Sequence, residues 1–362
     1  MQRGEERLRE AKAIPILEVA ERLGLAGLHR AGGEHVGPCP VCGGKDRFSI
    51  NPNLAVFNCR RCDQGGDGVA LVAHVLGCDF IRALDFLVGA AAPEIDKRAL
   101  EARRKKAQAE DAARAATADR MRARAIADAR AIWGRAGPGE GTAAQAYLAA
   151  RGIAFDAWPP TLKFIPDHPM IKRLEGMARA REIHRGPAMI APIQGPDGQV
   201  RAVHQTWIDA AQPGQKADVR HPDTGAAQPA KLVRGSKKGG AIRLGRVVPG
   251  ATLVMGEGIE TTASAMVSWS NPQAVYWAGV DLGNMAGRQV GRNTGVPDMS
   301  DAAAFVPPEG LARLIYLQDG DSDPVATRAK LEAGLRRAVR SRPGLEVQIA
   351  QAPAGKDFND IL

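Results

Sequence analysis

The sequence has few aromatic side chains, few cysteines and no long apolar run. Aromatic residues make up 4% of the 362 residues, and only three of them are tyrosines, so we expect the core to consist mainly of aliphatic side chains. No apolar stretch is long enough to span a bilayer, and no targeting segment precedes the first motif. We therefore expect a protein of the cytoplasm with no membrane partner.

Acidic residues are also under-represented. The chain has 49 Lys and Arg residues against 40 Asp and Glu residues, which gives a formal net charge of +9 and a pI near 9.5. An excess of this size favours a polyanionic partner but indicates no sequence preference. The length predicts two or three domains.

Four of the five cysteines form two C-x-x-C pairs, Cys39/Cys42 and Cys59/Cys62, with sixteen residues between the pairs. This spacing is typical of a closed, structural four-thiolate zinc site. A pair of disulfides or a redox C-x-x-C remains an alternative, although neither suits two matched pairs in a reducing compartment. Cys78 lies in an apolar stretch, and we expect it to be a buried helical thiol.

The hairpin between the cysteine pairs mixes cations, aromatics and hydrogen-bonding groups. Such a mixture suits the neutralisation of phosphates and stacking on bases, although an ordinary solvated surface is the alternative. The predicted nucleic-acid contacts are Lys45, Arg47, Phe57, Arg60 and Arg61.

A charged segment follows at residues 97–130. It contains eleven Lys or Arg residues against five Asp or Glu residues, so it carries six of the nine excess positive charges. Strong helix formers and i,i+4 pairs predict a long exposed helix. Such a helix can serve as a spacer or can follow a nucleic acid, and the spacer is the slightly favoured interpretation.

A second informative stretch is "ATLVMGEGIETTASAMVSW" at residues 251–269. "TLVM" predicts a buried strand, "GEG" a tight turn and the remainder a helix, so Glu257 should lie at the carboxyl end of a strand. "LARLIYLQDGDSDP" repeats this pattern, with Asp319 and Asp321 at the carboxyl end and Asp323 just beyond. If the two strands are neighbours in a parallel sheet, these carboxylates share one crevice.

Carboxylates at such close range repel one another unless a divalent cation lies among them. Oxygen ligands of this number suit Mg²⁺ or Mn²⁺ shared with a substrate phosphate, which is an arrangement that phosphoryl transfer uses. The alternative is that "DGDSD" only caps the helix that begins at Pro324.

In combination, these motifs resemble the DnaG-type primases, particularly the plasmid- and phage-borne forms in which a zinc ribbon precedes a Toprim domain. The resemblance rests on "GPCPVCGGKDRFSI", "FNCRRCDQGGDGVALV", "MGEGIETTAS", "LQDGDSDP" and the closing "GKDFNDIL". It implies that Glu257, Asp319 and Asp321 are catalytic acids that hold magnesium, that Asp323 is an outer member, and that Glu257 takes part in proton transfer.

The chain departs from the family in two respects. Cellular primases often have His in the first ligand pair, whereas Cys42 makes this site all-cysteine, as in phage-type forms. The sequence contains no P-loop motif, so we expect unwinding to depend on a separate replicative helicase.

The resemblance also implies a fold class and a division of the chain into domains. It implies an α/β fold with a zinc ribbon and flanking helices, a charged helical linker, and a mixed α+β primase-like core that ends in a Toprim fold. The expected domains are residues 1–92 (zinc-binding), 93–131 (linker), 132–248 (first part of the catalytic core) and 249–362 (Toprim).

The segment "KLVRGSKKGG" and the final residues carry further candidates for nucleotide binding. Cations on a close-approaching backbone suit triphosphates or a template strand, although a solvated loop is the alternative. Lys356 can also reach a phosphate, and Asp357 and Asp360 can extend the acidic crevice or cap the last turn. The predicted nucleotide contacts are Lys231, Arg234, Lys237 and Lys238.

The sequence therefore predicts a primase of a plasmid, phage or other mobile element. It would join ribonucleoside triphosphates on a single-stranded DNA template, with structural Zn²⁺ and catalytic Mg²⁺ or Mn²⁺. The alternatives are a Toprim nuclease that uses the same acids, and a zinc-ribbon replication adaptor without catalysis. A topoisomerase requires a tyrosine nucleophile, and we expect Tyr147, Tyr276 and Tyr316 to be buried or helical.

Overall fold

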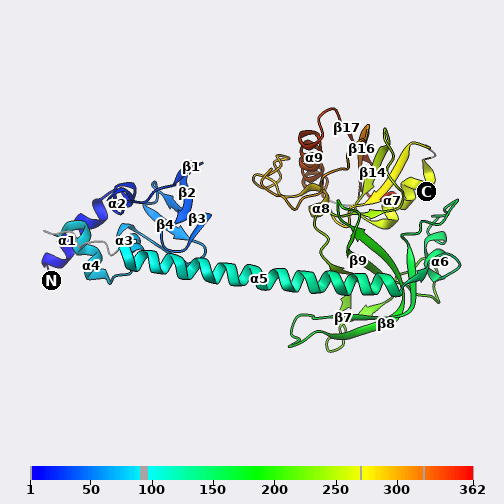
Figure 1. Ribbon diagram of the computed structural model, residues 1–362, viewed down its shortest axis with the longest axis horizontal. Coiled ribbons are helices and arrows are strands. Elements are labelled where there is room, and N and C mark those ends of the chain that lie inside the picture. The colour runs from blue at the N-terminus through cyan, green and yellow to red at the C-terminus, as the bar shows by residue number, and fades with distance from the viewer. Residues whose placement is uncertain (1, 90–96, 270, 321–322, 362) are drawn as a thin grey trace. The chain divides into compact units, whose positions relative to one another are not determined.

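The computed structural model describes the chain except residues 1, 90–96, 270, 321–322 and 362. The described residues form two compact units, residues 1–119 and 120–362. The expected α/β fold with an N-terminal four-cysteine ribbon is confirmed (Figure 1).

The first unit is built around an antiparallel sheet of short strands. Helices flank this sheet: α1 (Gln2–Ala13) and α2 (Ile16–Arg22) precede it, and α3 (Gly68–Leu76) and α4 (Phe80–Val88) follow it. Each strand pairs with the next in chain order. The strands are β1 (His29–Ala31), β2 (Glu34–Cys39), β3 (Gly43–Asn51), β4 (Val56–Cys59) and β5 (Gln64–Gly66).

Local signals fix the bounds of α3. The Asp67 side chain caps its first turn by accepting a hydrogen bond from the Ala70 N–H at 3.1 Å. Gly77 ends the helix in the left-handed conformation, with φ of 68°, which glycine adopts without steric cost. The apolar face of α3 packs with Ile16, Phe48 and Phe57 in one core.

The charged segment forms α5 (Lys97–Arg135), as the composition predicts. Its residues up to Asp119 belong to the first unit, and its remaining residues belong to the second unit. Arg103 donates hydrogen bonds to the His74 and Val75 carbonyl oxygens, both at 3.2 Å. The first part of α5 is therefore attached to the zinc-binding unit.

The second unit contains an antiparallel sheet with strand order β12-β9-β8-β7-β6. Helix α6 (Ala143–Ala149) packs on this sheet, and β10 (Val219–Arg220) pairs with β11 (Ala227–Gln228) nearby in the chain. The strands of the sheet are β6 (Gly137–Pro138), β7 (Lys163–Lys172), β8 (Arg181–Gln194), β9 (Val200–Trp207) and β12 (Lys231–Gly235).

A second sheet, with strand order β13-β15-β14-β16-β17, follows in the same unit. Its strands pair in parallel except β13, which forms an antiparallel edge. The strands are β13 (Ile242–Arg243), β14 (Thr252–Gly256), β15 (Ala274–Ala278), β16 (Arg313–Gln318) and β17 (Glu346–Gln351). The helices are α7 (Ile259–Ser268), α8 (Leu282–Ala286) and α9 (Pro324–Ser341).

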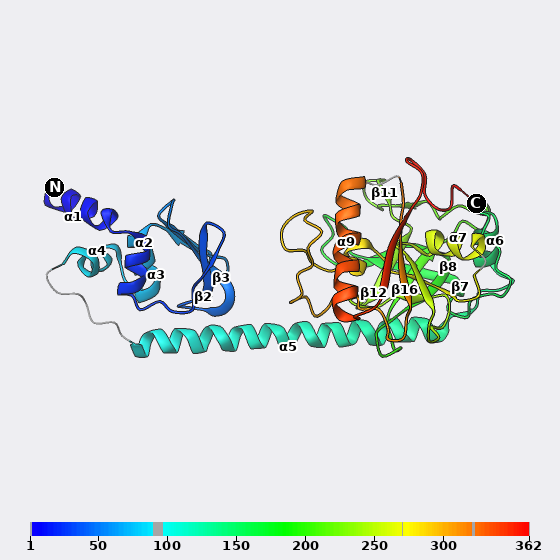
Figure 2. The same ribbon diagram turned by 90° about the horizontal axis from the view of Figure 1, so that it is seen from above.

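Both faces of this parallel sheet are buried. Leu253 and Met255 of β14 belong to the cluster that includes Leu331 and Leu335 of α9, which packs against β16 (Figure 2). Val254, which points to the other face, joins a cluster with Tyr147 of α6. Burial on both sides explains why the strand sequence "TLVM" is apolar without alternation.

Among the helices that the structure describes, none combines the length and apolar character needed to cross a membrane.

Candidate functional site

The four predicted zinc ligands meet at one point in the first unit. The Sγ atoms of Cys39, Cys42, Cys59 and Cys62 all lie within 4.8 Å of one another. The Cys39–Cys62 Sγ distance is 4.0 Å, and the Cys42–Cys59 distance is 3.7 Å. A tetrahedral zinc ion with bonds of about 2.3 Å separates its sulfur ligands by about 3.8 Å, so the cluster fits Zn²⁺.

The turns around the sulfurs favour thiolates. The Val41 N–H donates to Cys39 Sγ at 3.4 Å, and the Cys62 N–H donates to Cys59 Sγ at the same distance. Burial nevertheless raises the pKa of the Cys39 thiol to about 12 in the absence of a metal. The thiol is therefore protonated near neutral pH until a cation binds, and zinc uptake should release protons.

His74 of α3 contacts the cluster, and the sequence motif did not indicate it. Its Nε2 lies 3.6 Å from Cys39 Sγ, and its ring stacks on Phe57 with a centroid separation of 5.4 Å. Burial lowers the pKa of His74 to about 4, so the imidazole is neutral at physiological pH. His74 is thus a packing partner of the site, because the four cysteine sulfurs suffice for a tetrahedral zinc ion.

One predicted nucleic-acid contact is wrong. Phe57 is only 3% exposed, because it lies on the face of β4 that α3 covers. Its ring packs against Phe48, 5.8 Å away, and against His74. Phe57 therefore belongs to the core and is not available to stack on a base.

The hairpin cations have different partners. Arg47 Nη1 lies 2.9 Å from an Asp111 oxygen, and Arg61 lies 3.2 Å from Asp111 and 3.3 Å from Glu110. Arg60 donates to the Asp46 carbonyl oxygen, and Lys45 is exposed. Carboxylates of α5 therefore partly neutralise two of the predicted DNA contacts.

In the second unit, the parallel sheet brings Glu257 and Asp319 together. Glu257 follows β14, Asp319 follows β16, and these two strands are hydrogen-bonded neighbours. Both side chains line one cavity of about 250 Å³, together with Lys231 and Asp357. The expected placement of the two acids at the carboxyl ends of adjacent parallel strands is thus what the structure has.

The electrostatics of this crevice match a cation site. Burial, followed by repulsion from Asp281 and Asp319, raises the pKa of Glu257. Asp319 accepts hydrogen bonds from Thr261 Oγ1 at 3.2 Å and from the Phe358 N–H at 3.4 Å. A divalent cation would relieve the repulsion among these carboxylates, and carboxylate oxygens are the ligands that Mg²⁺ and Mn²⁺ prefer.

The last residues of the chain complete one wall of the crevice. The Gly320 N–H donates to the Lys356 carbonyl oxygen at 2.8 Å, and a Cβ at Gly320 would overlap the Pro353 carbonyl oxygen. Glycine at position 320 therefore permits the close approach that brings Asp357 to the cavity. The Lys356 side chain is exposed, and Asp360 accepts a hydrogen bond from the Asp357 N–H in the final turn.

The two other acids that were predicted to bind the metal are Asp321 and Asp323. Asp321 lies outside the described residues. Asp323 caps α9 by accepting hydrogen bonds from the Val325 and Ala326 N–H groups at 3.0 and 3.1 Å. The helix cap that was the alternative for "DGDSD" is therefore the role of Asp323 in the structure.

The four cationic side chains that were predicted to bind nucleotides lie in different environments. Lys231 lines the cavity, whereas Arg234 pairs with Asp128 and Lys237 pairs with Asp281. Lys238 is exposed. Of the four cations, only Lys231 reaches the crevice lining among the described residues.

Two features near the crevice were not indicated by the motifs, namely Asp281 and the contacts of Glu260. Asp281 follows β15 in "AVYWAGVD", a third strand-and-turn unit of the kind that identified Glu257. It is preceded by Val280, a β-branched residue at φ of 76° that lines the cavity. Side chains in this region of φ are strained, and such strain concentrates at functional sites.

Glu260 and Lys216 form a charged cluster that lines the same cavity as Glu257 and Asp319. The Glu260 Oε1 lies 2.8 Å from Lys216 Nζ and accepts a hydrogen bond from the Tyr147 hydroxyl at 2.8 Å. Despite burial, which raises it, these contacts with Lys216 and Tyr147 hold the pKa of Glu260 at about 2, below its ordinary value of 4.5. The partners are distant in sequence, so no local pattern indicates this cluster.

Glu260 should make the free energy of unfolding depend on pH in the acidic range. A lowered folded-state pKa contributes stability at pH above about 4.5, and this contribution, about 3 kcal/mol, is lost as the pH falls toward 2. Urea unfolding at pH 7 and pH 3 should show this loss in the wild type. Glu260→Gln should lose this contribution and unfold more easily at pH 7, by about 3 kcal/mol, while Lys216, whose side chain is 31% exposed, remains partly solvated.

The control for this prediction is Glu346→Gln, which removes an exposed carboxylate paired with Arg313. Surface pairs contribute about 0–1 kcal/mol, so this variant should match the wild type. The prediction would be contradicted if the free energy of unfolding changed by the same amount between pH 7 and pH 3 in Glu260→Gln and in the wild type.

The three tyrosines are buried, as expected. Tyr147 and Tyr316 are at most 1% exposed and Tyr276 is 5% exposed. Burial also raises the pKa of Tyr276 to about 12. None of these hydroxyl groups offers the accessible nucleophile that a topoisomerase requires.

Two family matches cover the first two thirds of the chain. Residues 8–103 match the CHC2 zinc finger, the zinc ribbon of DnaG. Residues 123–244 match a domain of unknown function, DUF7146. No curated protein matches the chain. The N-terminal unit therefore carries a zinc ribbon of the DnaG type, and the resemblance to DnaG-type primases is confirmed at this ribbon.

Three solved structures to which the chain is similar come from primases. The Aquifex aeolicus primase fragment with zinc-binding and RNA polymerase domains has 17% identity, a TM-score of 0.34, and coverage of 98% of this chain and 81% of its own. The bacteriophage T7 primase fragment has 14% identity, a TM-score of 0.30, and coverage of 92% and 94%.

A DNA primase domain from Pseudomonas aeruginosa has 14% identity and a TM-score of 0.35, with coverage of 62% of this chain and 68% of its own.

Proposed function

We propose that this protein is a DNA primase that makes short RNA primers on single-stranded DNA. The proposal rests above all on one observation: Glu257 and Asp319 end neighbouring parallel strands and line one cavity with Lys231. The DnaG-type ribbon on the same chain gives independent support. We also propose a replication role in a plasmid, phage or other mobile element.

In this proposal the crevice acids hold the catalytic metal. Glu257, Asp319 and Asp321 would bind Mg²⁺ or Mn²⁺, with Asp323 as an outer member that also caps α9. When bound, the cation supplies charge neutralisation at the triphosphate and activation of the attacking oxygen. The residues 249–362 would form the Toprim domain, after a core at 132–248, a linker at 93–131 and a zinc-binding domain at 1–92.

The side chains of the crevice have separate roles in nucleotide joining. The primer 3′-hydroxyl attacks the α-phosphate of the next ribonucleoside triphosphate, and pyrophosphate leaves. Glu257 accepts the hydroxyl proton, since its carboxylate lines the crevice beside Asp319 and Lys231. Lys231 binds phosphate oxygens, and Lys237, Lys238 and Arg234 follow it along the same segment. Catalysis depends mainly on positioning and charge neutralisation.

Primer synthesis is the direct test. The zinc-loaded protein, single-stranded DNA, Mg²⁺ or Mn²⁺ and labelled ribonucleoside triphosphates should yield short labelled oligomers. Shortening of the DNA would instead indicate a nuclease that uses the same acids with water as nucleophile. Intact DNA without synthesis, on varied templates and with a replicative helicase present, would favour the non-catalytic adaptor.

The pairing of hairpin arginines with α5 leads to a binding prediction. Asp111→Asn removes the carboxylate that Arg47 and Arg61 share. We expect the affinity for single-stranded DNA to rise severalfold at low salt, because Arg47 becomes available to phosphates and Arg61 retains only Glu110 as a partner among the described residues.

Fluorescence anisotropy across a salt series measures this effect. Glu101→Gln is the matched control, since it removes an exposed α5 carboxylate that pairs only with Lys105 among the described contacts. An Asp111→Asn affinity no higher than that of Glu101→Gln would show that Arg47 and Arg61 do not contact DNA.

A further inference from the structure

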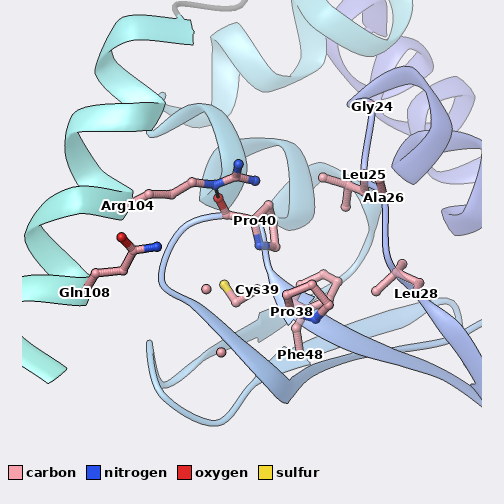
Figure 3. Close-up of a pocket in the computed structure, with 12 residues that line it drawn as sticks. Gly24, Leu25, Ala26, Leu28, Pro38, Cys39, Pro40, Phe48, Arg104 and Gln108 are labelled. Atoms are coloured by element: carbon pink, nitrogen blue, oxygen red, sulfur yellow. Dashed lines mark hydrogen bonds between the residues drawn. The ribbon is translucent and has the colours of Figure 1, made fainter. Parts of the chain in front are cut away.

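The first unit contains a cavity of about 440 Å³ between the first cysteine turn and α5 (Figure 3). Its volume lies in the range of about 300–1,000 Å³ that is typical of small-ligand sites. Pro38, Cys39 and Pro40 of the turn form one side, and Arg104 and Gln108 of α5 form another. One of the four clustered cysteines, Cys39, therefore also lines the cavity.

The lining has the chemistry of a base-binding site. Leu25, Leu28 and Pro38 offer apolar surfaces against which a flat ring can pack. The exposed side chain of Gln108 extends from α5 toward this space (Figure 3). Its amide both donates and accepts hydrogen bonds, which matches the paired donor and acceptor at the edge of a base.

The charge around the cavity favours an anionic chain. No Asp or Glu is among the residues that line it, whereas Arg104 is. Arg104 donates to the Pro40 carbonyl oxygen, which holds its guanidinium beside the cysteine turn. A Cβ at Gly44 would overlap the Arg47 side chain, so Arg47 lies across the glycine turn that borders the cavity, where it pairs with Asp111; Arg104 is therefore the cation on which the charge argument depends.

We propose that this cavity binds one unpaired base of single-stranded DNA. In this proposal Gln108 contacts the base edge and Arg104 contacts the adjacent phosphate. The inference rests on the proposed function, in which the ribbon binds template, and it gives the first part of α5 a role in choosing the template base. Adenine is the expected base, because glutamine pairs with it through two hydrogen bonds.

Binding by fluorescence anisotropy tests the inference without primer synthesis. The full chain, zinc-loaded, is titrated with labelled homopolymers of dA, dC and dT and with a strand of abasic deoxyribose phosphates. We expect the wild type to bind the preferred homopolymer about tenfold more tightly than the abasic strand. In Gln108→Ala most of the preference among the three bases should disappear, while affinity for the abasic strand is unchanged.

Two further variants separate base contact from charge. Arg104→Gln should weaken binding to all strands alike and lower the slope of log affinity against log salt by about one. Gln64→Ala, at an exposed position of β5 outside the cavity lining, should match the wild type. Zinc stoichiometry and circular dichroism confirm that each variant retains the fold.

Equal binding of all homopolymers by the wild type would overturn the inference, as would a base preference that survives in folded Gln108→Ala. Failure of the proposed function has a different signature. A Gln108-dependent base preference in a protein that makes no primers would reject the primase and retain the base-binding cavity.

Discussion

Glu257→Gln and Asp319→Asn are each expected to lower primer synthesis at least about a hundredfold, the effect typical of removing one main electrostatic contact to a transition state. Both side chains line the crevice at the ends of β14 and β16. Gel analysis of labelled oligomers at saturating Mg²⁺ measures the loss. Asp218→Asn is the matched control, since the Asp218 side chain is 69% exposed and pairs with Arg220.

Glu257→Gln should not destabilise the metal-free protein. Burial raises the pKa of Glu257, and repulsion from Asp281 and Asp319 raises it further, so the charged form of Glu257 is disfavoured in the metal-free protein. Neutralising Glu257 relieves this repulsion, so its melting temperature without metal should equal or exceed that of the wild type. Added Mg²⁺ should raise the melting temperature of the wild type more than that of the variant.

A loss of activity together with a large loss of stability would mean that Glu257 has a structural role. Undiminished synthesis in both variants would place catalysis elsewhere in the chain.

Removal of zinc is the second change with a large expected effect. Structural zinc contributes about 10–16 kcal/mol of apparent binding free energy in small zinc domains, and the ribbon strands β1, β4 and β5 are at most four residues long. A strong chelator, or Cys59→Ser, should therefore unfold the ribbon and abolish primer synthesis on single-stranded templates.

Limited proteolysis and zinc analysis measure this outcome. Cleavage should become rapid within residues 34–66, while the second unit, which has its own cores, should stay protected. Cys78→Ser is the matched control, because Cys78 lies outside the four-sulfur cluster. A chelated protein that resists cleavage at the ribbon would show that packing alone stabilises it.

The zinc site and the carboxyl-end acids could be predicted because their signals are local. A C-x-x-C turn places two sulfurs on one ion whatever surrounds it. Likewise, the strand, glycine turn and helix around Glu257 are encoded within "TLVMGEGIETTAS", and the strand before Asp319 within "RLIYLQ". Asp281 follows the same pattern and could have been found in the same way.

The sequence-based predictions failed, or were incomplete, where the environment of a side chain depends on an element that is distant in the sequence. Phe57 alternates with its neighbours along β4, but the sequence of the strand does not state which face α3 will cover. The partner of Arg47 and Arg61 is Asp111, at least fifty residues later in the chain. Glu260 meets Lys216 and Tyr147 from separate elements, and no local pattern encodes these contacts.

The sequence by itself determined the four zinc ligands and the strand–turn–helix units, because these depend on residue types at short spacing. The excess of positive charge follows from the composition alone. Only the tertiary structure decided that β14 and β16 are neighbours, which arginines are paired, and that α5 and the first cysteine turn enclose a cavity. Those outcomes depend on long-range strand pairing and on which faces become buried. Strand pairing and burial are determined by many residues together, so they cannot be predicted from any single segment.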